Sequence, residues 1–257
     1  MPFVTVEGAR LHYTVDGALG APPLILSNSL SSDLTMWDRQ VEQWSRRFRI
    51  IRYDQRGHGG SSAPEGEYSM AMLGKDVLAL MDHLAIERAD WCGISMGGMT
   101  GMWLALNAPS RLDRLVLANT SPYMPPAELW DGRIATAKAG GMEALATPTV
   151  ERWFPPEFRA RNPETVERTR QMVLATPVNG YAGCCAAIRD MNLRDEIAGI
   201  AHETLVIVGE RDLSTPPAEG EFIQRSIAGS RLVRLDAGHV SNIERPDDFA
   251  SAVDRFL

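Results

Sequence analysis

Two patterns of hydrophobic and polar positions alternate along most of the chain. Short apolar runs that end in glycine or polar residues are typical of buried strands. Segments in which apolar residues recur every three or four positions predict helices with one buried face. An alternating segment around a Glu-Gly turn, residues 3–17, predicts a hairpin. Strands are expected within residues 22–29, 49–57, 89–94, 111–122, 204–212 and 231–238, and helices within 36–48, 69–86, 96–109, 216–227 and 245–257.

The order of these elements predicts the fold class. Strands alternate with helices up to about residue 121 and again from near residue 203, which indicates a mainly parallel sheet with helices on both faces. Residues 122–195 differ, since they contain several prolines and three or four helical patterns but no convincing strand. We therefore expect an α/β core formed by residues 1–121 and 196–257, with residues 122–195 inserted as a helical cap.

Composition and charge narrow the class of protein. The chain of 257 residues, 44% of them hydrophobic, is long enough to bury one sizeable core. Its net charge of −7 argues against a nucleic-acid or anionic-membrane partner, because both favour a basic surface. Cys92, Cys184 and Cys185 show neither a disulfide framework nor metal-binding CxxC spacing, which fits a reducing compartment. We see no signal peptide and no apolar run of about 18 residues, so we expect a cytoplasmic location. The oligomeric state is left open.

One serine stands where neither strand nor helix favours it. The stretch DWCGISMGGMTGMWLAL places Ser95 between Gly93 and Gly97, at the junction of a predicted strand and a predicted helix. Serine and glycine are unfavourable in the interior of a strand or a helix, so a gain in stability does not explain the arrangement. In a tight G-x-S-x-G turn the flanking glycines nearly touch, and the serine hydroxyl is lifted clear of the backbone at a helix N-terminus. The pattern predicts a nucleophile, with a serine that merely caps the helix as the alternative.

A nucleophilic serine needs a base, and the base needs an orienting carboxylate. In the chain order that accompanies this turn, the acid and then the histidine follow at the carboxyl ends of later strands. Asp212 in VIVGERDLSTPP and His239 in LVRLDAGHVSNIERP occupy these two places. The alternatives at the same edge are Glu210 and Asp236 for the acid, and His58 in DQRGHGGSS for the base.

An oxyanion hole for such a serine needs two backbone N–H groups about 3 Å from the developing charge. One is expected from Met96, the residue after the nucleophile. The other is expected from the loop after the strand PPLILS, at Leu30. Because these are backbone donors, the side chains at the two positions need not be polar.

Together these motifs resemble the α/β-hydrolase superfamily. The motifs YDQRGHGGS, GISMGG, GERD and AGHVSNIERP occur in the order typical of that family, and the similarity covers nearly the whole chain except the insertion. The chain departs from the family at the loop SNSLSSDLTMW, where Asn28-Ser29 replaces the commoner His-Gly. The resemblance implies an α/β-hydrolase fold with its site at the carboxyl ends of the strands.

A closer resemblance comes from the segment SNSL…MWD and from the insertion. The stretches GGMEALA, ERWFPPEFRARNPE and GYAGCCAAIRDMNLRDE are similar to those of 3-oxoadipate enol-lactonases of bacterial aromatic degradation. This resemblance implies an enol-lactone substrate, 3-oxoadipate as the product, and neither a cofactor nor a metal. Such a lactone carries a carboxylate, so the partner would be a small anion.

An anionic substrate implies a cation in the pocket, and we expect it in the insertion. The candidates are Arg133, Arg152, Arg159, Arg161 and Arg189. Arg133 is the first choice because it shares a helix face with Trp130, and Arg189 is the second. Trp130 and Trp153 are expected to pack within the cap or to form a wall of the pocket.

Two other interpretations remain open at this stage. The first is another serine hydrolase of the same fold, such as a small-ester esterase or a hydrolase that cleaves a C–C bond of a ring-cleavage product. The second is a hydrolase-like binding protein without catalysis, which the loss of a triad residue would favour. Enzymes of this fold that use aspartate as the nucleophile are disfavoured by Ser95.

Overall fold

A computed structural model describes residues 2–257 of the chain. Within this range eight strands form one sheet in the order β1-β2-β4-β3-β5-β6-β7-β8. The strands are β1 (Phe3–Val6), β2 (Ala9–Asp16), β3 (Pro23–Ser27), β4 (Arg49–Tyr53), β5 (Ala89–Ile94), β6 (Leu112–Ala118), β7 (Thr204–Gly209) and β8 (Arg231–Leu235). From β4 through β8 neighbouring strands are parallel, while β1 and β2 form an antiparallel hairpin and β2 pairs antiparallel with β4. The expected fold class is therefore confirmed.

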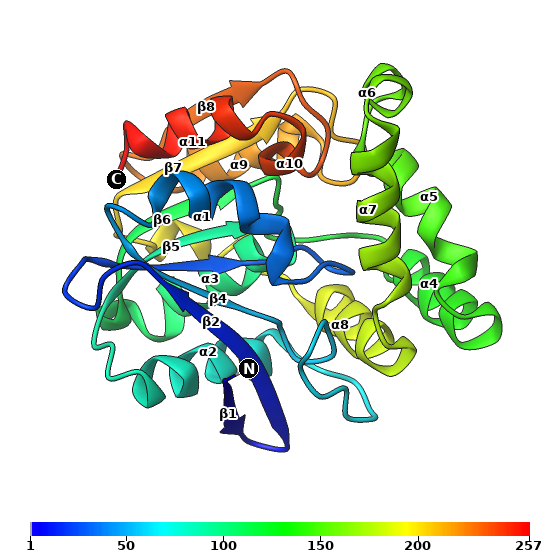
Figure 1. Ribbon diagram of the computed structural model, residues 1–257, viewed down its shortest axis with the longest axis horizontal. Helices are drawn as coiled ribbons and strands as arrows, with labels where there is room; N and C mark the ends of the chain where they lie inside the picture. The colour runs from blue at the N-terminus through cyan, green and yellow to red at the C-terminus, as the bar shows by residue number, and fades with distance from the viewer. Residues whose placement is uncertain (1) are drawn as a thin grey trace.

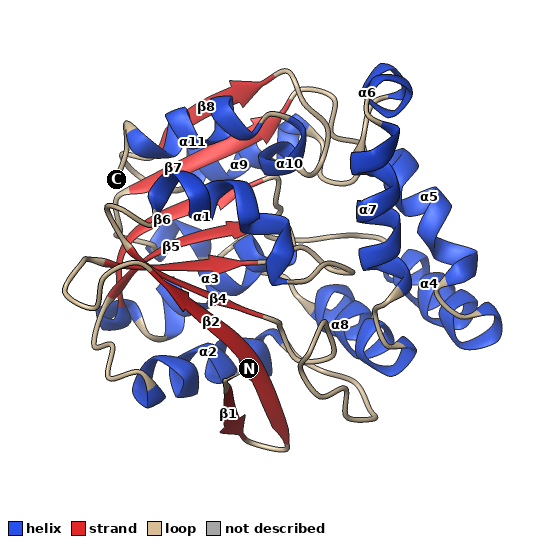
Figure 2. Cartoon of the chain, in the orientation of Figure 1, coloured by secondary structure: helices blue, strands red, loops and turns tan. Residues whose placement is uncertain are grey.

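Helices cover both faces of the sheet (Figure 2). The helices α1 (Asp38–Trp44) and α11 (Pro246–Asp254) lie on one face, and α2 (Met70–His83), α3 (Met96–Asn107) and α9 (Pro217–Ser226) on the other. The central strands β5 and β7 are buried along their whole length, as continuous apolar strands enclosed on both faces should be. The short elements are η1 (Leu34–Trp37), η2 (Pro109–Arg111), η3 (Ile197–Gly199) and α10 (Ser241–Glu244).

The remaining helices gather at the end of the sheet toward which the parallel strands point (Figure 1). They are α4 (Ala127–Gly140), α5 (Glu143–Trp153), α6 (Pro156–Arg161), α7 (Pro163–Leu174) and α8 (Val178–Asp190). We call residues 122–195 the cap. At its neck Tyr123 and Asn192 form an antiparallel bridge, and the Leu193 amide donates to the Pro122 carbonyl. These contacts support our proposal that the cap is an insertion into a core formed by the flanking segments.

The cap and the core approach each other backbone to backbone at one point. Gly57, in the loop after β4, has a φ of 84°, and Gly180 belongs to α8. A side chain on Gly180 would collide with the carbonyl of Gly57, and a side chain on Gly57 would collide with the Cα of Gly180. Glycine at both positions therefore lets α8 rest directly on the β4 loop.

One predicted helix begins later than its pattern suggested. The helical spacing started at Met36 and Trp37, but these residues belong to the 3₁₀ helix η1, and α1 begins at Asp38. The Asp33 carboxylate accepts from the Thr35 amide and caps η1, so the chain first forms this tighter turn. Among residues 2–257, none of the helices is both long enough and apolar enough to cross a membrane.

Candidate active site

Ser95 occupies a strained turn between β5 and α3. Its backbone has φ 56° and ψ −116°, a conformation that costs a non-glycine residue about 1–3 kcal/mol. A side chain on Gly93 would collide with the carbonyl of Gly97, and one on Gly97 would collide with the carbonyl of Ser27 in β3. The Ser95 amide donates to the Ala118 carbonyl at 3.0 Å, which ties the turn to the neighbouring strand β6. The two glycines thus allow the sharp turn that the sequence predicted.

Asp212 and His239 lie next to each other beyond the carboxyl ends of β7 and β8. Asp212 follows β7 and His239 follows β8, and both side chains are buried. Nδ1 of His239 lies 2.9 Å from one carboxylate oxygen of Asp212 and 3.1 Å from the other. A carboxylate at Nδ1 holds the proton there and leaves Nε2 as an acceptor, which is the tautomer that a general base requires. Ser95 and His239 line the same pocket.

Four donors besides His239 surround the Asp212 carboxylate. The amides of Ser214 and Thr215 donate to Oδ1 at 2.7 and 2.9 Å, and Thr215 Oγ1 and Asn119 Nδ2 donate to Oδ2 at 2.7 and 3.0 Å. Burial alone would raise the pKa of Asp212, but His239, Thr215 and Asn119 together hold it below its usual value. The carboxylate therefore stays ionised and fixed in orientation.

The alternative acids and the alternative base lie elsewhere. The exposed carboxylate of Asp236 pairs with Arg211 at 2.9 Å, and Glu210 is also exposed. His58 is completely buried, and its Nε2 accepts the backbone N–H of Ser31 at 2.9 Å. The structure thus brings Asp212 to His239, and it gives His58 a different set of partners.

The two residues expected to supply the oxyanion hole belong to different elements. Leu30 lies in the loop after β3 and lines the pocket with Ser95, while Met96 is the first residue of α3. Within residues 2–257 the backbone N–H groups of Leu30 and Met96 have no hydrogen-bond acceptor. In place of the commoner His-Gly, Asn28 donates to the Tyr53 carbonyl at 2.9 Å and accepts from Trp37 Nε1 at 2.9 Å. Asn28 therefore anchors the oxyanion loop to β4 and to η1.

The pocket lies between the core and the cap. From the core it is lined by Ser95, His239 and the loop that contains Leu30. From the cap it is lined by parts of α4, α5 and α8, including Tyr181. Burial raises the pKa of Tyr181 well above its usual value, so the phenol remains neutral.

Two cap arginines, Arg133 and Arg152, line this pocket. Arg133 lies over the ring of Trp130, with its guanidinium carbon 4.5 Å from the ring centre, as their shared helix face predicted. Arg152 is half-buried, its Nη2 donates to Thr149 at 3.3 Å, and its buried Nε has no acceptor. Burial and the nearby Arg133 charge lower the pKa of Arg152. Within residues 2–257 no carboxylate pairs with either guanidinium. An anion between them would relieve both the repulsion and the unmet hydrogen bonding.

The other candidate arginines do not meet at this pocket, which corrects the expectation for Arg189. The guanidinium of Arg189 lies outside the pocket because three carboxylates hold it on the surface, those of Glu67, Asp131 and Asp190. Arg159 pairs with Glu151, and Arg161 is exposed. Trp130 and Trp153 do line the pocket, and the ring of Trp153 lies 5.9 Å from that of His239.

Some residues of the site were not singled out from the sequence. Asn119 has a φ of 45° and follows β6, so it lies at the same sheet edge as the triad. Its Oδ1 accepts from Ser241 at 2.6 Å while its Nδ2 donates to Asp212. The polar residues in ANTS, which directly follow an apolar strand, were the feature of the sequence that could have indicated a site residue here. In the described part of the chain, no group of His, Cys, Asp or Glu side chains has an arrangement that could hold a metal ion.

Comparisons with known proteins agree with this geometry. A family model described as the alpha/beta hydrolase fold matches residues 22–246. The chain is 39% identical to 3-oxoadipate enol-lactonase 2 of Acinetobacter baylyi over 99% of its own length and 95% of that protein. The crystal structure of an enol-lactonase from Burkholderia xenovorans LB400 is 45% identical, with a TM-score of 0.98 over 100% of this chain and 99% of that one. A hydrolase from Pseudomonas aeruginosa PA01 is 50% identical, with a TM-score of 0.97 over 100% and 97% of the two chains. The resemblance to 3-oxoadipate enol-lactonases is thus confirmed, and the chain belongs to the α/β-hydrolase fold family.

Proposed function

We propose that the protein opens 3-oxoadipate enol-lactone to 3-oxoadipate through an acyl-enzyme on Ser95. The observation that supports this most strongly is the composition of the pocket. Ser95 and His239 line it from the core, while Arg133 and Arg152 line it from the cap and pair with no carboxylate of residues 2–257. A serine nucleophile beside two guanidinium groups suits a substrate that joins an ester to a carboxylate. The relatives named as enol-lactonases support the same assignment.

The first half of the reaction breaks the lactone ring. Oγ of Ser95 attacks the ring carbonyl, and Nε2 of His239 takes the hydroxyl proton. The N–H groups of Leu30 and Met96 stabilise the oxyanion, each contributing roughly 10²–10³-fold. When the ring C–O bond breaks, its electron pair leaves on an enolate oxygen, which is a better leaving group than an alkoxide. The enolate takes the proton back and becomes a ketone, so ring opening is hard to reverse.

The second half of the reaction releases the acid. His239 takes a proton from water, and the resulting hydroxide attacks the acyl carbon on Ser95. The ester bond to Oγ then breaks, the serine recovers its proton, and 3-oxoadipate leaves. Throughout both steps Asp212 holds the His239 ring and stabilises its charged form. One water is consumed for each lactone opened.

The carboxylate of the substrate would bind between Arg133 and Arg152. An unpaired carboxylate is costly to bury, and a guanidinium offers it charge-assisted hydrogen bonds. Trp130 lies beneath Arg133 and would shield the pair from water. Such an activity belongs to bacterial aromatic degradation. A cytoplasmic location and the lack of a nucleic-acid partner stay predictions.

A panel of substrates tests the assignment. We expect kcat/KM for 3-oxoadipate enol-lactone to exceed by far that for p-nitrophenyl acetate and for a vinylogous diketone acid. A preference for the acetate would indicate a small-ester esterase, and a preference for the diketone acid would indicate a C–C bond hydrolase. Turnover of none of the three, with no labelling of Ser95 by a fluorophosphonate, would indicate a binding protein.

A further inference from the structure

We propose that His58 is a positioning residue that holds the oxyanion loop in its working conformation. This inference rests on the serine-hydrolase mechanism proposed above. Nε2 of His58 accepts the backbone N–H of Ser31 at 2.9 Å. Ser31 directly follows Leu30, whose N–H is the expected oxyanion donor, and both residues line the pocket. His58 itself is completely buried and lies behind the loop.

The hydrogen-bond partners of His58 define its tautomer. Nδ1 lies 3.3 Å from the Arg56 carbonyl, which can only accept, so Nδ1 carries the proton. Nε2 is then a free acceptor for the Ser31 amide. Burial lowers the pKa of His58 to about 4, against weaker opposing effects of the Arg56 carbonyl and Asp54, so the ring stays neutral at ordinary pH. A protonated ring would present a second N–H to Ser31 and would break the bond.

The bond is needed because the oxyanion loop is strained at Ser31. Ser31 has a φ of 65°, in the left-handed region that favours glycine. It lies at the third position of a turn closed by the Ser32 amide, which donates to the Ser29 carbonyl at 3.3 Å. A positive φ at this position normally requires glycine or asparagine. Without the acceptor, the peptide between Leu30 and Ser31 is free to turn over, which relieves the strain and moves the Leu30 backbone.

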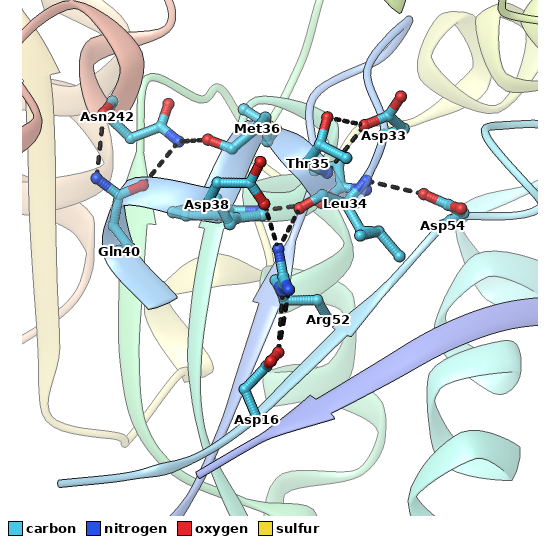
Figure 3. A network of polar contacts seen from close by, with 12 residues as sticks. Asp16, Asp33, Leu34, Thr35, Met36, Asp38, Gln40, Arg52, Asp54 and Asn242 are labelled. Atoms are coloured by element: carbon cyan, nitrogen blue, oxygen red, sulfur yellow. Dashed lines mark hydrogen bonds and ion pairs between the residues drawn. The ribbon is translucent and has the colours of Figure 1, made fainter. Parts of the chain in front are cut away.

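A second anchor from the same β4 loop fixes the far end of this segment. Oδ1 of Asp54 accepts the Leu34 amide at 2.8 Å, and Arg52 donates to the Leu34 carbonyl at 3.3 Å (Figure 3). Asp54 is fixed in turn by His12, whose Nδ1 lies 2.7 Å from its Oδ2. The segment from Ser31 to Leu34 is therefore held at both ends, by His58 toward the pocket and by Asp54 toward η1.

Two substitutions of His58 by side chains of similar length distinguish a role in positioning the oxyanion loop from a role in packing. In His58→Gln the side-chain oxygen can occupy the place of Nε2 and accept from Ser31. In His58→Met a side chain of similar reach has no comparable acceptor. His83→Met is the control, because it removes a histidine hydrogen bond, to the Tyr13 hydroxyl at 3.1 Å, that involves neither the oxyanion loop nor the β4 loop. We would measure kcat and KM for p-nitrophenyl acetate, the affinity for a boronic acid that forms a tetrahedral adduct, and the unfolding temperature.

We expect His58→Met to lower kcat by roughly 10–100-fold with KM changed less than about threefold, since a misplaced oxyanion donor acts on the transition state. The affinity for the boronic acid should fall in parallel, while His58→Gln recovers most of kcat and His83→Met retains it. The inference is wrong if His58→Met keeps the kcat of the wild type. It is equally wrong if the Gln and Met variants lose kcat alike. Should His58→Met not fold, His58→Asn replaces it, because its amide is too short to reach Ser31.

The choice of substrate keeps this test separate from the proposed function. p-Nitrophenyl acetate is neither a lactone nor an anion, so the comparison of variants holds even if the natural substrate is a different ester. A Ser95→Ala variant that retained full esterase activity would instead overturn the mechanism itself.

Discussion

The backbone carbonyl of Trp153, the last residue of α5, accepts a hydrogen bond of 2.8 Å from the backbone N–H of His239. The cap thus contacts the loop that contains the candidate base directly. A side chain on the preceding residue, Gly238, would collide with the same carbonyl. On the core side of this junction, Arg211 pairs with Glu157 of α6 and with Asp236. The cap therefore helps to hold the backbone of His239 in place, and it also lines the pocket.

Gly238→Ala should lower both stability and activity, because the new methyl group must push the Trp153 carbonyl away from His239. We expect a loss of about 1–3 kcal/mol in the free energy of unfolding and a reduced kcat. Gly132→Ala is the control, since nothing lies within 4 Å of a Cβ atom at that exposed position of α4. It should stabilise the protein by about 0.5–1 kcal/mol. Urea unfolding gives the stability of both variants, and an esterase assay gives their kcat. If Gly238→Ala has the stability and kcat of the wild type, the contact between Trp153 and His239 does not support the base.

Arg133→Met and Arg152→Met should each weaken turnover of an anionic lactone while sparing a neutral ester. A desolvated arginine–carboxylate contact is worth roughly 1.5–3 kcal/mol, or about ten- to a hundredfold in kcat/KM. The ratio of the two activities is the quantity to measure, because it cancels damage to folding. Arg189→Met provides the control, since it removes a cap arginine whose three carboxylate partners keep it on the surface. If the ratio is unchanged in both pocket variants, the arginines do not bind the substrate.

Asp212→Asn should cost several orders of magnitude in kcat, because an amide at this place favours the wrong tautomer of His239. Two of the four other donors to this carboxylate would also meet an NH₂ group in place of an oxygen. Glu210→Gln changes the exposed carboxylate two residues before Asp212 and should leave kcat close to that of the wild type. A loss below tenfold for Asp212→Asn would remove Asp212 from the proposed mechanism.

Local sequence was sufficient to predict the sheet, the elbow and the placement of Asp212 near His239. Each of these depends on a strand and on the few residues that follow it, and parallel strands bring their carboxyl ends to one edge. The choice among the cap arginines could not be made in this way. Whether an arginine faces the pocket, as Arg152 does, or a surface carboxylate, as Arg189 does, depends on how helices pack against each other. The bond from Ser31 to His58 spans 27 positions and joins two irregular loops, so no periodic pattern signals it.

His58 also gives the protein a predictable pH dependence of stability. Its pKa is about 4 in the folded protein, below its usual value of about 6.5. Between these values the unfolded chain binds a proton that the folded protein does not, so stability falls as pH falls from 6.5 toward 4. The full effect is about 3 kcal/mol. The difference in unfolding free energy between pH 6.5 and pH 4.5 should therefore be smaller in His58→Gln than in the wild type, as urea titrations can show. Equal differences in the two proteins would contradict a neutral, buried His58.

The measurement that tests the central claim most directly is the turnover of synthetic 3-oxoadipate enol-lactone, followed by the loss of its ultraviolet absorbance. We expect rapid loss with the wild type, formation of 3-oxoadipate in equal amount, and loss at the background rate with Ser95→Ala. Absence of turnover by a wild-type protein that hydrolyses simple esters would contradict the substrate assignment, and undiminished turnover by Ser95→Ala would contradict the mechanism.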